Sequence, residues 1–160
     1  MQASDLISIV ALCISFAAAY FSYRLGRRTF HVTTYAEATD RTLRMDEVFI
    51  QYPLLRPYFS DGEPMPAADS TDRELRNRVL AVAEFVVDIL EDCWEKEDYY
   101  AGKDRSAWRE WIYDVFASSP ACCEHYAHNV PWYPTLNRLF KNEGPPPRQV
   151  QRVIAELTSP

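Results

Sequence analysis

An uninterrupted apolar run near the N-terminus constrains the fold of this chain more than any other feature. Residues 6–23, LISIVALCISFAAAYFSY, hold 18 positions without a charge or a proline. As an α-helix this run would span about 27 Å, close to the hydrocarbon thickness of a bilayer. The run therefore predicts a single transmembrane helix. A buried core helix is the alternative, because the run is only moderately hydrophobic.

The order of the charges argues against a secretory signal peptide. Such a peptide begins with positive charge and ends at small residues where it is cleaved. Here the run follows MQASD and is itself followed by Arg24, Arg27 and Arg28. Short flanks rich in arginine stay in the cytosol, so this basic collar predicts an outer N-terminus and a cytosolic C-terminus. Residues 1–28 are then the anchor with its collar, and residues 29–160 are the cytosolic domain.

Small residues recur along one stripe of the predicted membrane helix. The stripe consists of Ser8, Ala11, Ser15, Ala18, Ala19 and Ser22. Lipid provides no hydrophobic drive for helix association, so contact between membrane helices depends on close approach of their backbones. The stripe therefore predicts docking on another membrane helix, either a second copy or a larger subunit. The alternative is that Ala and Ser are simply common in membrane helices.

Helical periodicity and turn residues predict an all-α bundle after the membrane helix. Residues 29–51 form an amphipathic pattern that continues from the membrane segment, and residues 71–74 form a capping box that starts a helix reaching about residue 98. Further helices are expected over 106–117, from Pro120 after the N-cap residue Ser119, and over 148–157. No segment has a convincing strand pattern, so the fold class is one transmembrane helix followed by a small helical bundle.

Composition and motifs narrow the function mainly by exclusion. The net charge is −6, with most of the acidic excess in the middle of the chain, which makes a nucleic-acid partner improbable. The four cysteines lack a CxxC pair, and the chain has no GxSxG motif and no glycine-rich phosphate loop. Cys122, His125 and His128 are spread around a helix and do not converge as zinc ligands would. The sequence therefore predicts no catalytic residue, no cofactor and no metal ion.

Acidic residues share one face of the predicted helix over 71–98. This acidic face consists of Glu84, Asp88, Glu91, Asp92 and Glu95. Like charges four residues apart each cost about 0.2–0.5 kcal/mol of helix stability. The favoured interpretation is a solvated surface, and the alternatives are compensation by arginines of neighbouring helices, by a basic protein partner or by a divalent cation.

Three segments resemble a family of small uncharacterised bacterial membrane proteins. They are YPLLRPYFSDG at 52–62, RVLAVAEFVVDILE at 78–91, and Ser119-Pro120 followed by WYPTL at 132–136. Members of that family have one N-terminal membrane helix and an aromatic-rich helical domain, and the resemblance covers most of residues 20–140. It implies an all-α cytosolic domain at a bacterial inner membrane and supplies no catalytic residue.

Two classes of function fit these features. The first is a non-enzymatic, membrane-anchored interaction, regulatory or accessory-subunit protein whose partners are the lipid bilayer, another membrane helix and a basic protein. The second is a metal-dependent enzyme or sensor that uses the acidic face over 84–95. The first is favoured because the sequence contains no constellation of catalytic residues.

Overall fold

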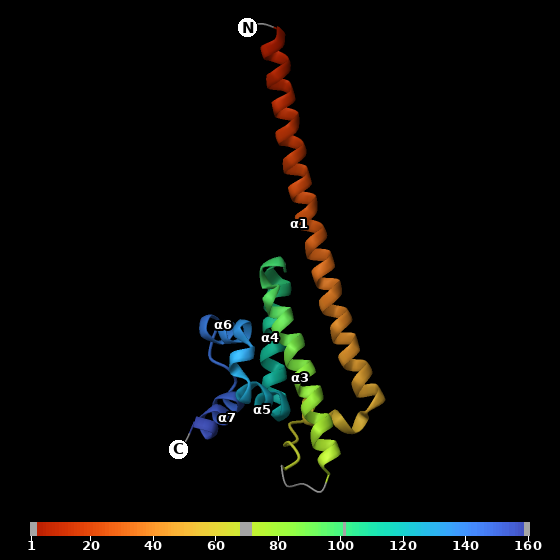
Figure 1. Ribbon diagram of the computed structural model, residues 1–160, viewed down its shortest axis with the longest axis vertical. Coiled ribbons are helices and arrows are strands. Elements are labelled where there is room, and N and C mark those ends of the chain that lie inside the picture. The colour runs from red at the N-terminus through yellow and green to blue at the C-terminus, as the bar shows by residue number, and fades with distance from the viewer. Residues whose placement is uncertain (1–2, 68–71, 101, 159–160) are drawn as a thin grey trace.

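The computed structural model describes residues 3–67, 72–100 and 102–158, without the side chains of residues 3–7 and 9. Every regular element in these ranges is helical, which confirms the predicted all-α class. Figure 1 shows one very long helix and a smaller group of helices beside its C-terminal half. We call residues 3–28 of the long helix the stalk, and the remaining described residues the body.

The long helix α1 runs from Ala3 to Gln51 over 49 residues, which corresponds to about 74 Å at the usual helical rise. The predicted membrane segment and the amphipathic segment after it therefore form one continuous helix. No proline occurs before Pro53, and Pro53 disfavours the helical conformation at Tyr52, where α1 has ended. Over the residues that the structure describes, α1 included, no helix is long and apolar enough to cross a membrane.

The chain reverses direction after α1 through two short helical turns. These are η1 (Pro53–Leu55) and α2 (Pro57–Ser60). The next helix, α3 (Arg73–Glu95), runs back along α1. Its N-cap is Asp72, whose Oδ1 accepts a hydrogen bond from the backbone N–H of Leu75 at 2.9 Å. The predicted capping box placed this role on Thr71, which lies outside the described residues.

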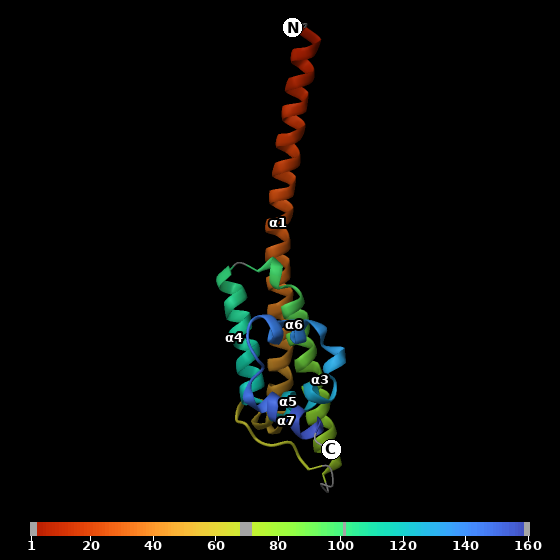
Figure 2. The same ribbon diagram turned by 90° about the vertical axis from the view of Figure 1, so that its left-hand side faces the viewer.

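The remaining elements complete the body, with α4 to the left of α3 and the blue C-terminal helices nearer the viewer in Figure 2. They are η2 (Glu97–Tyr99), α4 (Gly102–Ser118), α5 (Pro120–His128), η3 (Val130–Trp132), α6 (Pro134–Asn142) and α7 (Arg148–Thr158). The start of α5 confirms its predicted cap, since the Ser119 hydroxyl accepts from the backbone N–H of Cys122 at 3.1 Å. The helix expected over 106–117 begins earlier, at Gly102, and the helix expected to reach residue 98 ends at Glu95.

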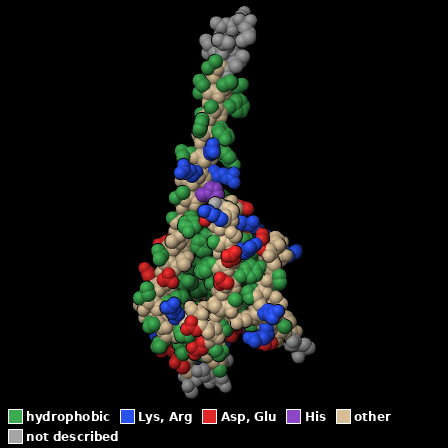
Figure 3. Space-filling model, turned by 180° about the vertical axis from the view of Figure 1, so that it is seen from behind, with side chains coloured by type: hydrophobic (Ala, Val, Ile, Leu, Met, Phe, Trp, Pro, Cys, Tyr) green, Lys and Arg blue, Asp and Glu red, His purple; other side chains and the backbone are tan. Residues whose placement is uncertain are grey.

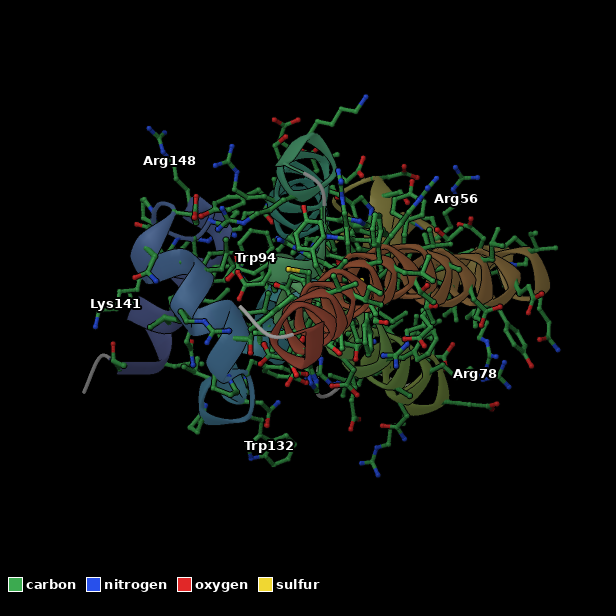
Figure 4. The ribbon with its side chains drawn as sticks, turned by 90° about the horizontal axis from the view of Figure 1, so that it is seen from above. Arg56, Arg78, Trp94, Trp132, Lys141 and Arg148 are labelled. Atoms are coloured by element: carbon green, nitrogen blue, oxygen red, sulfur yellow. The ribbon has the colours of Figure 1, made fainter. Side chains whose placement is uncertain are left out.

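The hydrophobic core is centred on α3, because that helix is covered by α1 on one side and by α4, α5 and α6 on others. Trp94 is the largest fully buried side chain and lies in the middle of the body, whereas Trp132 points outward into solvent (Figure 4). Aromatic rings from three helices pack edge to face around Phe116, with centroids 5.3 Å from Tyr126 and 5.6 Å from Phe140. The body thus has its own core, and none of the described side chains of the stalk belongs to it.

Candidate functional site

The stalk exposes a long apolar surface. Its large apolar side chains from Val10 to Tyr23 are each between 52% and 69% exposed. Figure 3 shows these side chains along the length of the stalk, above the body. Among the described side chains of α1, Thr34 is the first that is buried. Contact with η2 begins at Phe30, whose ring lies 6.2 Å from that of Tyr99, and contact with α3 follows. The stalk is therefore a helix whose apolar side chains have no cover within the described chain.

The six small residues predicted to form a contact stripe all lie on the stalk and are exposed. The hydroxyl of Ser15 donates to the backbone carbonyl of Ala11 at 2.9 Å. Back-bonding of this kind satisfies a serine hydroxyl within its own helix. The Ser15 hydroxyl is therefore already hydrogen-bonded, so Ser15 would favour a second helix by its small size rather than by an unsatisfied hydroxyl.

The basic collar lies where the stalk meets the body. Arg24, Arg27 and Arg28 are exposed, and within the described chain none of them forms an ion pair. Figure 3 shows Lys and Arg side chains gathered at this junction. The apolar surface of the stalk is thus followed at once by a band of uncompensated positive charge.

The five carboxylates of the acidic face have different environments in the structure. Glu91 accepts hydrogen bonds from the backbone N–H groups of Thr135, at 2.6 Å, and Leu136, at 2.8 Å, and so caps α6. Asp88 accepts from the hydroxyl of Tyr133 at 3.2 Å. Asp88 is nevertheless exposed, as are Glu84 and Glu95. The interpretation as one solvated surface therefore needs correction, because α6 and its preceding turn pack against part of it.

Asp92 lies on the side of α3 that faces α1, where its charge is compensated. Its Oδ2 lies 2.9 Å from Nη1 of Arg41 and 3.1 Å from Nζ of Lys96. Lys96 also pairs with Glu37 of α1 at 3.1 Å. An arginine and a glutamate of α1 thus join α3 in one network of ions, so a neighbouring helix supplies the compensation at Asp92.

A chain of three polar side chains connects α3 with α5. His125 Nε2 lies 2.8 Å from the hydroxyl of Tyr133, which in turn donates to Asp88. Burial lowers the pKa of His125, despite the nearby carboxylates of Glu84 and Asp88. Burial and the Asp88 carboxylate raise the pKa of the Tyr133 hydroxyl. A neutral imidazole and a protonated phenol suit a structural hydrogen-bond chain better than acid–base chemistry near neutral pH.

The thiols of the body are not placed for catalysis. Cys93, Cys122 and Cys123 have no exposed surface, and burial raises the pKa of each thiol to about 12. Thiolates are the reactive form, so these three are inert near neutral pH. His128 is exposed whereas Cys122 is buried, so these two side chains do not converge. Among the described residues, no three His, Cys, Asp or Glu side chains are grouped as metal ligands.

Sequence reasoning missed two adjoining hollows between α1 and the η2 turn. The first, of about 490 Å³, is lined by Ser22, Tyr23, Gly26, Arg27, Phe30, Asp98 and Tyr99. The second, of about 450 Å³, is lined by His31, Val32, Tyr35, Tyr99, Tyr100 and Asp104. Tyr99 belongs to both, so the two hollows adjoin at this side chain, and we refer to them together as the groove. The adjacent tyrosines Tyr99 and Tyr100 were the signal available in the sequence.

Comparison of the chain with protein-family models, with curated proteins and with solved structures found no match in any of the three.

Proposed function

We propose that this chain is a non-enzymatic interaction, regulatory or accessory-subunit protein that residues 1–28 anchor in a membrane. One observation carries the proposal: the stalk exposes each described large apolar side chain from Val10 to Tyr23 by more than half. Contiguous apolar surface of this extent is typical of membrane or protein contacts. Covering seven large apolar side chains is worth on the order of 10 kcal/mol, which is ample for stable attachment.

The charges at the two ends of the apolar run favour a bilayer over a protein groove. Residues 6–23 carry no charge, Asp5 precedes them, and the collar of Arg24, Arg27 and Arg28 follows them. Tyr20 and Tyr23 lie beside the collar, where aromatic residues are common in membrane proteins. Arginine-rich flanks stay in the cytosol, so the proposal places the body in the cytosol and the N-terminus outside. We extend it to a bacterial inner membrane, as the family resemblance implies.

The proposal includes a second membrane helix as partner, either a second copy or a larger subunit. The stripe of small residues leaves room on the stalk for a neighbouring backbone. The exposed carboxylates Glu84 and Glu95 are the part of the acidic face that is open to a basic protein. A metal-dependent enzyme or sensor at residues 84–95 is less well supported, because Glu91 and Asp92 already have partners within the body.

Membrane attachment is tested by alkaline washing of membranes from a bacterial host that expresses the full chain. We expect the wild-type chain to stay in the membrane pellet. The double variant Leu12→Arg/Phe16→Arg should be released, because arginine at the centre of a membrane helix costs roughly 2.5–3.5 kcal/mol. The matched control is Leu54→Arg/Trp132→Arg, which changes two large apolar side chains on the body that are at least as exposed. Release of the wild-type chain would refute the proposal.

Orientation requires a separate measurement. Fused after Pro160, a green fluorescent protein should be fluorescent, whereas an alkaline phosphatase should be inactive, because the C-terminus is proposed to be cytosolic. The opposite pair of results would overturn the orientation while leaving membrane attachment in place.

A further inference from the structure

The groove between α1 and η2 combines apolar walls with charges of both signs. Its shared residue, Tyr99, is half-exposed and packs its ring 6.2 Å from that of Phe30. Deeper in the groove, the ring of Tyr100 stacks on Trp108 at 5.8 Å, and the ring of Tyr35 meets Trp108 edge to face at 6.3 Å. These ring contacts make the tyrosine wall a fixed surface rather than a set of loose side chains.

The charged side chains of the groove lack partners within the described chain. Arg27 lies at the collar end, whereas Asp104 lines the deeper hollow. Neither forms an ion pair with another described residue. A second carboxylate, Asp98, lies at the rim beside Arg27. The hollow toward the stalk therefore holds one positive and one negative group, and the deeper hollow holds one negative group. The net negative charge of the groove disfavours a ligand that is only anionic.

The same groove contains unsatisfied polar groups. Two buried side-chain atoms of the described residues have no hydrogen-bond partner, His31 Nδ1 and the hydroxyl oxygen of Tyr100. Both residues line the deeper hollow, and Tyr100 is only 7% exposed. Buried polar groups in native proteins are nearly always paired with protein, with ordered water or with a ligand. Both atoms are closed to solvent, so these polar groups are left unsatisfied behind the wall of the hollow rather than on its surface.

We propose that the groove binds the headgroup of a zwitterionic phospholipid with a primary or quaternary amine, taken from the bilayer that the stalk enters. Arg27 pairs with the phosphate, and the ammonium group lies against the faces of Tyr35 and Tyr99 beside the Asp104 carboxylate. The assignment rests on the proposed membrane anchoring, because it needs the collar at the bilayer surface.

The order of the charges along the helix fits this ligand. Arg27 precedes His31 by four residues and Tyr35 by eight, so it lies about 6 and 12 Å nearer the stalk along the axis. In a zwitterionic phospholipid the phosphate is likewise nearer the acyl chains than the amine is. Aromatic faces attract cations, and a nearby carboxylate strengthens that attraction. An anionic phospholipid without an amine would leave Asp98 and Asp104 uncompensated.

The groove is tested with the full chain in mild detergent, by native mass spectrometry with phosphatidylethanolamine or phosphatidylglycerol added. We expect the amine-bearing lipid to bind at least about fivefold more tightly, Asp104→Asn to remove most of that preference, and Arg27→Gln to weaken the binding of both lipids. The matched controls are Arg56→Gln and Asp61→Asn, which remove one exposed charge of each sign at the other end of α1 and should keep the preference. Equal binding of the two lipids, or equal loss in the controls, would overturn the assignment.

Two further measurements distinguish failure of the groove assignment from failure of the proposed anchoring. Flotation of the chain with vesicles of either lipid reports anchoring alone, and it should be unaffected by Asp104→Asn and by the two control variants. A chain that floats without a headgroup preference would overturn only the groove, whereas a chain that does not float would overturn the proposed function. Displacement of bound lipid by micromolar free phosphoethanolamine would assign the groove to a soluble compound and so overturn the bilayer source.

Discussion

Glu91 on α3 accepts a hydrogen bond from the backbone N–H of Leu136 at 2.8 Å, and its other carboxylate oxygen accepts from the neighbouring Thr135 at 2.6 Å. These two N–H groups belong to the first turn of α6, which begins at Pro134 and has no side-chain cap of its own from Tyr133. A carboxylate at a helix N-terminus satisfies orphan donors and interacts favourably with the helix dipole. One member of the acidic face thus fixes a second helix to the first.

Replacing Glu91 with glutamine should destabilise the body. The amide keeps the shape but loses the charge and one of the two acceptor oxygens, so we expect the free energy of unfolding to fall by about 1–2 kcal/mol. Urea denaturation of the full chain in mild detergent, followed by circular dichroism, measures the change. Glu84→Gln is the matched control, since Glu84 is exposed on the same helix and should change stability by less than about 0.5 kcal/mol. Equal effects of the two variants would contradict the capping role.

Replacing Asp92 with asparagine should loosen the packing of α1 on α3. The Asp92 carboxylate is 21% exposed and joins Arg41 and Lys96, and an ion pair of this partly buried kind contributes about 1 kcal/mol. Hydrogen exchange of the backbone amides over residues 34–45 should become several-fold faster. Asp40→Asn is the control, because Asp40 is exposed and pairs only with Arg44 of its own helix. Unchanged exchange in Asp92→Asn would contradict a contribution of this ion pair to the packing of α1 on α3.

The stability of the body should decrease when the pH falls below about 6.5. Burial lowers the pKa of His125 in the folded chain below its ordinary value of 6.5. The unfolded chain therefore takes up a proton on His125 first, and stability that is fully present above pH 6.5 is lost as the pH falls toward the folded pKa. Unfolding midpoints in urea at pH 5 and pH 8 measure this slope. His125→Gln should flatten it, whereas the same change at the exposed His128 should leave it unchanged.

Local sequence patterns predicted the helices whose start signals are adjacent to them. Ser119-Pro120 is such a signal, and α5 begins there. The helix α6 was not predicted, and its start at Pro134 has no side-chain cap from the adjacent Tyr133. Its cap is supplied by Glu91, which is 44 residues away from Thr135 in the sequence. A contact over that distance leaves no local pattern, so the helix was not visible until α3 and α6 were placed together.

The candidate sites also divide into those that local sequence predicts and those that depend on tertiary packing. A helical wheel placed five carboxylates on one face of α3, but it could not show that α1 and α6 pack against parts of that face. The groove at Tyr99 and Tyr100 depends on how the η2 turn lies against α1, and this register is a property of the tertiary packing. The apolar run and the collar were recognisable because charge and hydrophobicity along a single helix are local properties.

Filling the stripe of small residues should weaken the proposed contact with another membrane helix. Ser15→Leu/Ala18→Leu keeps the stalk hydrophobic but prevents close approach of a second backbone. We expect crosslinking in native membranes and co-purification of partners to fall severalfold. The control is Val10→Leu/Phe16→Leu, which changes two exposed side chains outside the stripe and should leave both readouts unchanged. Unaltered crosslinking in the stripe variant would refute the role of the stripe.

The four cysteines should report both the fold and the anchoring in one labelling experiment. Cys93, Cys122 and Cys123 are fully buried with pKa values raised to about 12, so they should not react with a charged maleimide while the body is folded. Cys13 is exposed on the stalk, but the bilayer should shield it from a charged reagent. In intact membrane vesicles we therefore expect no labelling. In mild detergent we expect slow labelling of Cys13 alone, and in denaturing detergent labelling of all four.

The matched control is Cys13→Ser, which should lose only the signal seen in mild detergent. Rapid labelling of Cys13 in intact vesicles would place the stalk in water and contradict the proposed anchor, whereas labelling of Cys93 there would contradict the packing of α1 on α3.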